Sequence, residues 1–319
     1  MAVKLCSSKL DCRLRDFGKI NKRWRMAKTR QSEAEKYAFV GPAVLYAVVM
    51  IIAPLLYTFF LSFHEWSMSG IEKPIFVSFK NFAELFKDER FLASIARTFI
   101  FSAMALPLEL VLGIATALLL NRKFVGKNIV KTLFLLPMVA TPVSVGLVWM
   151  LIYEPTIGFA NTLIAMLGIK LMPVWLGSTQ MALFSLAIVD IWQWTPMISL
   201  IVLAGLSALP SEPFESAKVD GATKGQTLFK ITLPMLAPTI SAAMLLRLID
   251  VLKTFDIIYS TTKGGPNFST ETLNIYAFAQ AFQYFTLGSA SAVLVVFFMI
   301  VLATSIVFII LRNKFKVEM

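Results

Sequence analysis

The sequence predicts an all-α polytopic membrane protein with six transmembrane helices. Hydrophobic residues make up 57% of its 319 positions, and the mean hydropathy is +0.74. Charged residues make up 15%, whereas soluble domains average about a quarter. Long apolar windows recur along the chain, and Lys and Arg gather in alternate segments between them. These three observations exclude an ordinary soluble domain.

The apolar windows are long enough to cross a bilayer, which takes roughly 20 mainly apolar residues. They are apolar on all faces, as in helices surrounded by lipid and by other helices. Only helices and closed barrels satisfy backbone groups in lipid, and runs of this length indicate helices. The six predicted spans cover approximately residues 39–63, 97–120, 130–152, 181–206, 239–260 and 289–311.

The basic residues predict that both termini are cytoplasmic, because cytoplasmic loops carry an excess of Lys and Arg. Residues 1–38 hold eleven Lys or Arg against four acids, and 121–131 hold four with no acid. The predicted organisation has three parts. They are a basic N-terminal arm (1–38) containing Cys6 and Cys12, a six-helix membrane domain (39–312) and a cytoplasmic tail (313–319).

Residues 207–238 form a polar, charged stretch between two of the most apolar windows. Ser211 is a candidate N-cap, and Glu212 and Glu215 suit the positive end of a helix dipole. Asp220-Gly221 is a turn signal, and Thr223 is positioned to start a second helix. The pattern predicts two short helices bent at Gly221, with Pro234 and Pro238 separating them from the next span. Such a cytoplasmic projection either packs only against its own chain or docks on a partner.

Within this stretch, the sequence ESAKVDGATKGQTLFKITLP at 215–234 resembles the EAA loop of ABC-importer permeases. Ser216, where the family usually has Ala, is the one departure from the pattern. The resemblance implies a type I ABC-importer permease fold, in which this loop docks on a separate ATPase. The residues assigned to ATPase coupling are Phe214, Glu215, Ser216, Ala217, Asp220, Gly221, Ile231, Leu233 and Pro234.

A second stretch resembles carbohydrate importers of the maltose and glycerol-3-phosphate type. Its signature begins at Thr262 with Thr-x-Gly-Gly-Pro and Thr-Glu-Thr, and continues through Tyr276 and Phe282 to Gly288. This resemblance implies a permease subunit of a binding-protein-dependent ABC importer in the bacterial cytoplasmic (inner) membrane. The implied solute is a sugar or oligosaccharide, and both a neutral and an acidic sugar agree with the resemblance.

The implied partners are a second homologous permease, two copies of a cytoplasmic ATPase and an extracytoplasmic solute-binding protein. The chain has no G-x-x-x-x-G-K-[ST] loop, so ATP and magnesium are expected on the ATPase and no cofactor on this chain. No pattern of metal ligands or of nucleophile and base stands out, which predicts a transporter subunit rather than an enzyme. An ion-coupled secondary carrier is the alternative.

The fifth window is unusual because it carries Arg247, Asp250, Lys253 and Asp256 at three-residue spacing. Such neighbours on a helix either neutralise one another inside the bundle or face the solute pathway. Aromatic faces suit sugar rings, and Asp, Gln and Arg suit hydroxyl groups. By analogy with the family, the predicted pathway residues are Asp190, Trp192, Gln193, Trp194, Arg247 and Asp250.

Overall fold

The computed structural model describes residues 39–68, 73–169 and 172–316. The chain divides into two units, Met1–Thr58 and Phe59–Met319. The described part of the first unit is helical and belongs to the helix Phe39–Ser62, which is long and apolar enough to cross a membrane. The predicted N-terminal arm, with Cys6 and Cys12, lies outside the described residues.

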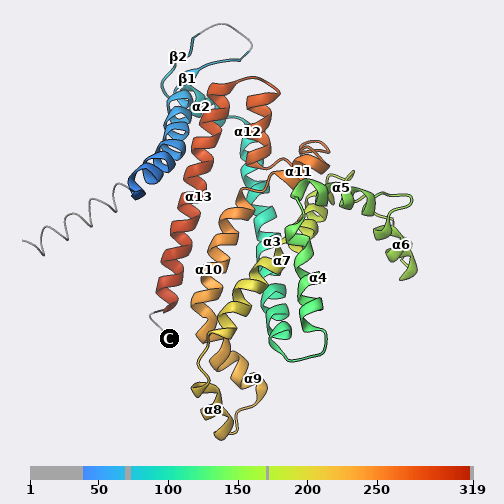
Figure 1. Cartoon of the computed structure of the whole chain (residues 1–319). Coiled ribbons are helices and arrows are strands. Elements are labelled where there is room, and N and C mark those ends of the chain that lie inside the picture. Colours follow the sequence, from blue (N-terminus) through green and yellow to red (C-terminus); the bar gives the residue numbers. More distant parts are fainter. Residues whose placement is uncertain (1–38, 69–72, 170–171, 317–319) are drawn as a thin grey trace, which may run out of the picture. The chain divides into compact units, whose positions relative to one another are not determined.

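Three helices form the centre of the second unit: α3 (Glu89–Asn121), α7 (Ala182–Ser207) and α10 (Leu233–Leu252). Helix α3 packs most extensively against α7, and α10 packs against both of them (Figure 1). A side chain at Gly113 would overlap Ile198 of α7. Helices can approach this closely in a membrane only where one of them carries a small residue.

The third predicted span is not one straight helix. It consists of α4 (Lys127–Val139) and α5 (Pro142–Ile152), with a bend of 98° between them. The residue before a proline avoids helical geometry, and Thr141 is extended accordingly. The described residues therefore contain five candidate spans, or six if this bent pair crosses the membrane once.

Shorter elements lie between and beside the spans. A short helix, α2 (Lys80–Leu85), precedes α3, and another, α6 (Phe159–Met166), lies between α5 and α7 in the chain. The last candidate span is α13 (Leu287–Lys316), which packs against α2 and against α12 (Leu273–Phe282). The other short elements are β1 (His64–Glu65), β2 (Ile75–Phe76) and α11 (Asp256–Thr261).

The Thr-x-Gly-Gly-Pro signature forms the link between α11 and α12, and ion pairs hold it to the start of α3. The buried Glu271 carboxylate accepts two hydrogen bonds from Arg90, at 2.7 and 2.5 Å. Arg97 Nε donates to the Glu271 backbone oxygen at 2.8 Å. Thr270 Oγ1 donates to the Gly265 carbonyl at 2.7 Å. Bidentate arginine–carboxylate pairs are strong and directional, so these contacts fix the loop against the helix.

The prediction that Pro234 and Pro238 separate the polar stretch from the next span is wrong. Helix α9 (Lys224–Thr227) continues through a π-helical turn at Leu228–Thr232 directly into α10. Pro234 lies in the first turn of α10, where its missing N–H costs little. Leu233 N–H bonds to the Leu228 carbonyl, five residues back, so the wider π turn carries the chain into that position.

Candidate functional site

The polar stretch forms a projecting pair of short helices, α8 (Glu212–Val219) and α9. Gly221 has φ +73°, a left-handed conformation that strongly favours glycine. Its N–H bonds to the Lys218 carbonyl, and the Ala222 N–H bonds to the Ala217 carbonyl at 2.9 Å. These two bonds are the pattern of a Schellman motif, which terminates a helix at a left-handed residue. The predicted bend at Gly221 is confirmed.

The start of α9 is fixed by a capping box. Gln226 N–H donates to Thr223 Oγ1 at 3.3 Å, and Thr223 N–H donates to Gln226 Oε1 at 2.8 Å. This reciprocal pair satisfies two N–H groups that the helix leaves unpaired. Ser211 occupies the N-cap position of α8, but its side chain makes no capping hydrogen bond. The bend is thus defined by local contacts on both sides of Gly221.

The predicted coupling residues divide between the inside and the outside of this helix pair. Ala217 is buried and Phe214 is half-buried. Ile231, Leu233 and Pro234 are also half-buried, in the π turn and the start of α10. Phe229, beside Ile231 in the π turn, is 70% exposed. The predicted coupling residues that are exposed are Glu215, Ser216, Asp220 and Gly221.

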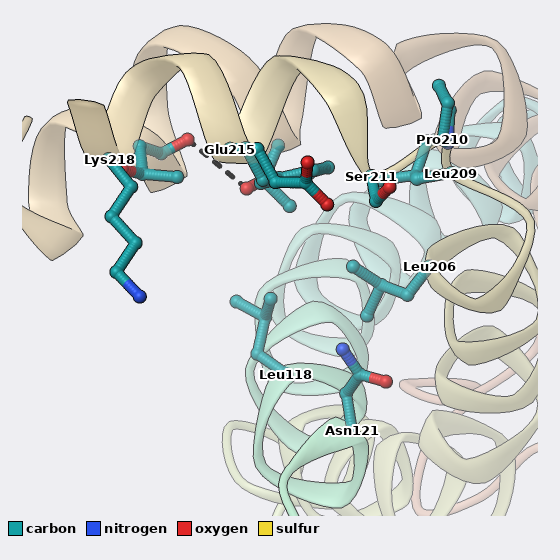
Figure 2. A pocket seen from close by; sticks show the side chains of 11 residues that line it. Leu118, Asn121, Leu206, Leu209, Pro210, Ser211, Glu215 and Lys218 are labelled. Atoms are coloured by element: carbon teal, nitrogen blue, oxygen red, sulfur yellow. Dashed lines mark hydrogen bonds between the residues drawn. The ribbon is translucent and has the colours of Figure 1, made fainter. Parts of the chain in front are cut away.

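A cavity of about 570 Å³ separates α8 from the ends of α3 and α7. Figure 2 shows Glu215 and Lys218 on α8, facing the ends of helices that carry Leu118 and Leu206. Asn121, the last residue of α3, lines the same space. Helix α8 therefore faces the ends of α3 and α7 across this cavity, and Ser216 and Val219 lie exposed outside its lining.

A cluster of charged side chains joins the three central helices. Arg247 of α10 donates from Nε and Nη2 to the two carboxylate oxygens of Glu109 on α3, at 2.6 and 2.9 Å. It also pairs with Asp190 of α7. All three side chains are at most 1% exposed. We call Glu109, Asp190 and Arg247 the charge triad.

The charge triad lies between two apolar clusters on the same helices. One cluster includes Ala105, Val189 and Val251, and the other includes Ala117, Ile198 and Leu236. Charges in such surroundings are costly unless paired and hydrogen-bonded. The triad therefore determines how α3, α7 and α10 can align.

A second cavity, of about 310 Å³, opens beside the charge triad. Asp190, Trp194, Arg247 and Asp250 line it, together with the segment that joins α10 to α11. The Trp194 ring lies 5.3 Å from Arg247 Cζ. Asp190 Oδ1 is buried and has no hydrogen-bond partner among the described residues. We call this space the central cavity.

Four of the six predicted pathway residues thus share the central cavity, and two do not. Gln193 is buried and donates to the Ala140 carbonyl at the bend between α4 and α5, at 3.3 Å. Trp192 packs edge-on against Trp149 and lines a separate apolar cavity beside α4. Among the described residues, no group of three His, Cys, Asp or Glu side chains is arranged to hold a metal ion.

Of the predicted neutralisation along α10, the structure shows the pair of Asp250 and Lys253, but Arg247 is neutralised by other helices. Arg247 pairs with other helices, while Asp250 pairs with Lys253 at 3.6 Å and both side chains are 49% exposed. Arg247 lies in the second half of α10. Because α10 begins at Leu233 and ends at Leu252, Arg247 is roughly 21 Å from its start, at 1.5 Å per residue.

Glu109 is the member of the site that sequence reasoning missed. It is the only acidic residue in the apolar window 97–120. An acidic residue in a membrane span is rare and usually paired or functional, so a signal was present. Its partner could not be read from the sequence, because Glu109 and Arg247 are separated by 138 residues.

Comparison with known families identifies the chain. Residues 109–316 match the family described as the inner membrane component of binding-protein-dependent transport systems. The chain belongs to this family. The permease is 39% identical over 269 residues to a protein of Sinorhizobium fredii named "Probable ABC transporter permease protein y4oQ", covering 84% of this chain and 86% of that one.

Other relatives agree with this family. The permease is 35% identical to the trehalose/maltose transport system permease protein of Thermococcus litoralis, over 86% of this chain and 92% of that one. It shares its fold with a bacterial ABC transporter involved in the import of the acidic polysaccharide alginate. There the TM-score is 0.78 at 22% identity, covering 91% and 99% of the two chains. The predictions of a type I importer fold, an inner-membrane location and a transporter subunit rather than an enzyme are confirmed.

Proposed function

We propose that the permease carries a sugar or oligosaccharide inward, driven by ATP hydrolysis on a separate subunit. The relative in Thermococcus litoralis is named for trehalose and maltose, and one in Agrobacterium fabrum is named for sulfoquinovosyl glycerol. The central cavity supports a polyhydroxylated solute, because it combines the Trp194 ring with carboxylate and guanidinium groups. Such sites pair apolar faces with a few polar groups that fix orientation.

The proposed complex contains a second homologous permease, two ATPase copies and an extracytoplasmic binding protein. A transporter of the same fold has been solved together with an alginate pentasaccharide-bound periplasmic protein, which supports the last of these partners. ATP and magnesium bind the ATPase in this proposal, and the permease itself carries no cofactor.

The helix pair α8–α9 is the observation that carries the proposal. It projects beyond the spans at the same end as the turn between α3 and α4 (Figure 1). That turn holds Arg122 and Lys123, Lys127 begins α4, and no acid lies among them, which favours a cytoplasmic location. A rigid projection on this side offers a surface to a cytoplasmic ATPase, and the bend at Gly221 fixes its shape.

Photo-cross-linking tests this docking directly. We expect a photoreactive phenylalanine analogue at Val219, which is 87% exposed at the end of α8, to cross-link the ATPase in assembled complexes. The matched control is the same analogue at Leu167, which is 70% exposed beside α6 on the predicted outer side. Cross-links from Leu167 but not Val219, or from neither in an intact complex, would contradict the proposal.

An ion-coupled secondary carrier is the second candidate function. The charge triad favours it, since ionisable side chains inside a membrane often belong to ion or proton pathways. The two candidates differ in their energy source, and this difference can be measured.

A further inference from the structure

The guanidinium of Arg247, which lines the central cavity, is already paired with carboxylates of the same chain. Glu109 engages Arg247 through both carboxylate oxygens, and Asp190 pairs with the same guanidinium. A bidentate carboxylate satisfies the guanidinium in the same way that a uronate or other acidic sugar would. An incoming anion would therefore have to displace Glu109, which is fully buried, from Arg247.

The remaining charges of the central cavity are mainly acidic. Its lining holds Asp190, Asp250 and Asp256 against Arg247 and Lys253. The Glu109 carboxylate, which lies outside this lining, offsets the charge of Arg247, and Lys253 lies 3.6 Å from Asp250. With these charges set against one another, Asp190 and Asp256 leave a net negative charge at the cavity, which favours cations over anions.

We propose that the central cavity selects a neutral, polyhydroxylated solute over an acidic one, and that Glu109 is the specificity-determining residue. This inference rests on the proposed transport function. The unpartnered Asp190 Oδ1 can accept a hydroxyl hydrogen bond, and the Trp194 and Phe255 rings that line the cavity can pack against a sugar ring. Glu109 acts through Arg247, by holding its charge away from the solute.

The potential inside the cavity can be measured without knowing the sugar. Thr254 lines the cavity and is half-buried, so a Thr254→Cys variant places a thiol there. The native Cys6 and Cys12 are replaced by Ser, and the chain is assembled with cysteine-free partner subunits. Reaction rates with a cationic and an anionic methanethiosulfonate, each divided by its rate with a free thiol, give a cation-to-anion ratio.

We expect this ratio to be about tenfold in favour of the cationic reagent. Glu109→Gln removes the charge that balances Arg247 and should lower the ratio at least about threefold. Asp250→Asn should lower it as well without touching the charge triad, which keeps the test valid if Glu109→Gln assembles poorly. A thiol at the exposed Gln180, which does not line the cavity, should show a ratio that Glu109→Gln leaves unchanged.

A ratio of one or below at Thr254→Cys would overturn the proposal. A ratio that neither Glu109→Gln nor Asp250→Asn changes would also overturn it. Because these rates do not depend on transport, they separate this inference from the proposed function. Failure of the proposed function would instead appear as absence of ATP-driven uptake while the ratio stays high.

Discussion

Replacing Arg247 with Met is expected to deplete the permease from the membrane. The substitution keeps most of the side-chain volume but leaves Glu109 and Asp190, both fully buried, without their cation. Removing one partner of a buried ion pair typically costs about 3–5 kcal/mol. Membrane abundance, measured by immunoblotting of membranes at equal expression, should fall severalfold.

A neutral triad should restore that abundance. In the triple variant Arg247→Met/Glu109→Gln/Asp190→Asn no uncompensated charge remains, and replacing a whole buried ion cluster is often close to neutral. Lys253→Met is the matched control. It breaks the half-exposed pair with Asp250, and exposed pairs contribute only about 0–1 kcal/mol. Wild-type abundance of Arg247→Met, or a triple variant no more abundant than the single one, would show that the triad does not hold the helices together.

Gly221→Val is expected to abolish transport while the permease remains in the membrane. Gly221 has φ +73° and an added Cβ would meet no atom within 4 Å, so the penalty comes from the backbone and not from crowding. A left-handed conformation costs an L-residue about 1–2 kcal/mol, and a β-branched residue is among the least tolerant. The α8–α9 bend should change shape, and the ATPase should lose its stimulation by loaded binding protein.

Gly225→Val is the control for that experiment. Gly225 is also exposed with open space around it, but it lies in α9 and its φ is not positive. A valine there adds the same side chain to the same loop without the backbone penalty. Stimulated ATP hydrolysis should stay near wild type in Gly225→Val. Equal stimulated ATP hydrolysis in Gly221→Val and Gly225→Val would contradict the claim that coupling depends on the bend at Gly221.

Local sequence signals predicted much of this structure. The apolar windows located the spans, and Asp220-Gly221 with Thr223 located the bend and the start of α9. These features depend on contacts within a few residues, such as the capping box between Thr223 and Gln226. The predictions were wrong where two local signals competed. Pro234 signals a helix end, but it also fits the first turn of α10 after a π turn.

The charge triad could be predicted only in part, because its pairs join distant parts of the chain. Spacing along one helix suggested Asp250 as the partner of Arg247, yet the partners come from α3 and α7. Asp250 and Lys253 lie three residues apart near the end of α10, where both side chains reach water. A buried guanidinium instead takes the carboxylates that tertiary packing brings to it. Likewise, the Gln193 amide donates a hydrogen bond to the Ala140 carbonyl. That carbonyl lies at the bend between α4 and α5, which the apolar window 130–152 did not predict.

The energy source of transport tests most directly the claim that the permease couples solute movement to a separate ATPase. Complexes are reconstituted into vesicles with binding protein outside and ATP inside, and uptake of radiolabelled trehalose or maltose is followed. We predict uptake that requires ATP and persists when a protonophore and a sodium ionophore collapse the ion gradients. Uptake driven by a proton or sodium gradient without ATP would contradict the account and favour a secondary carrier.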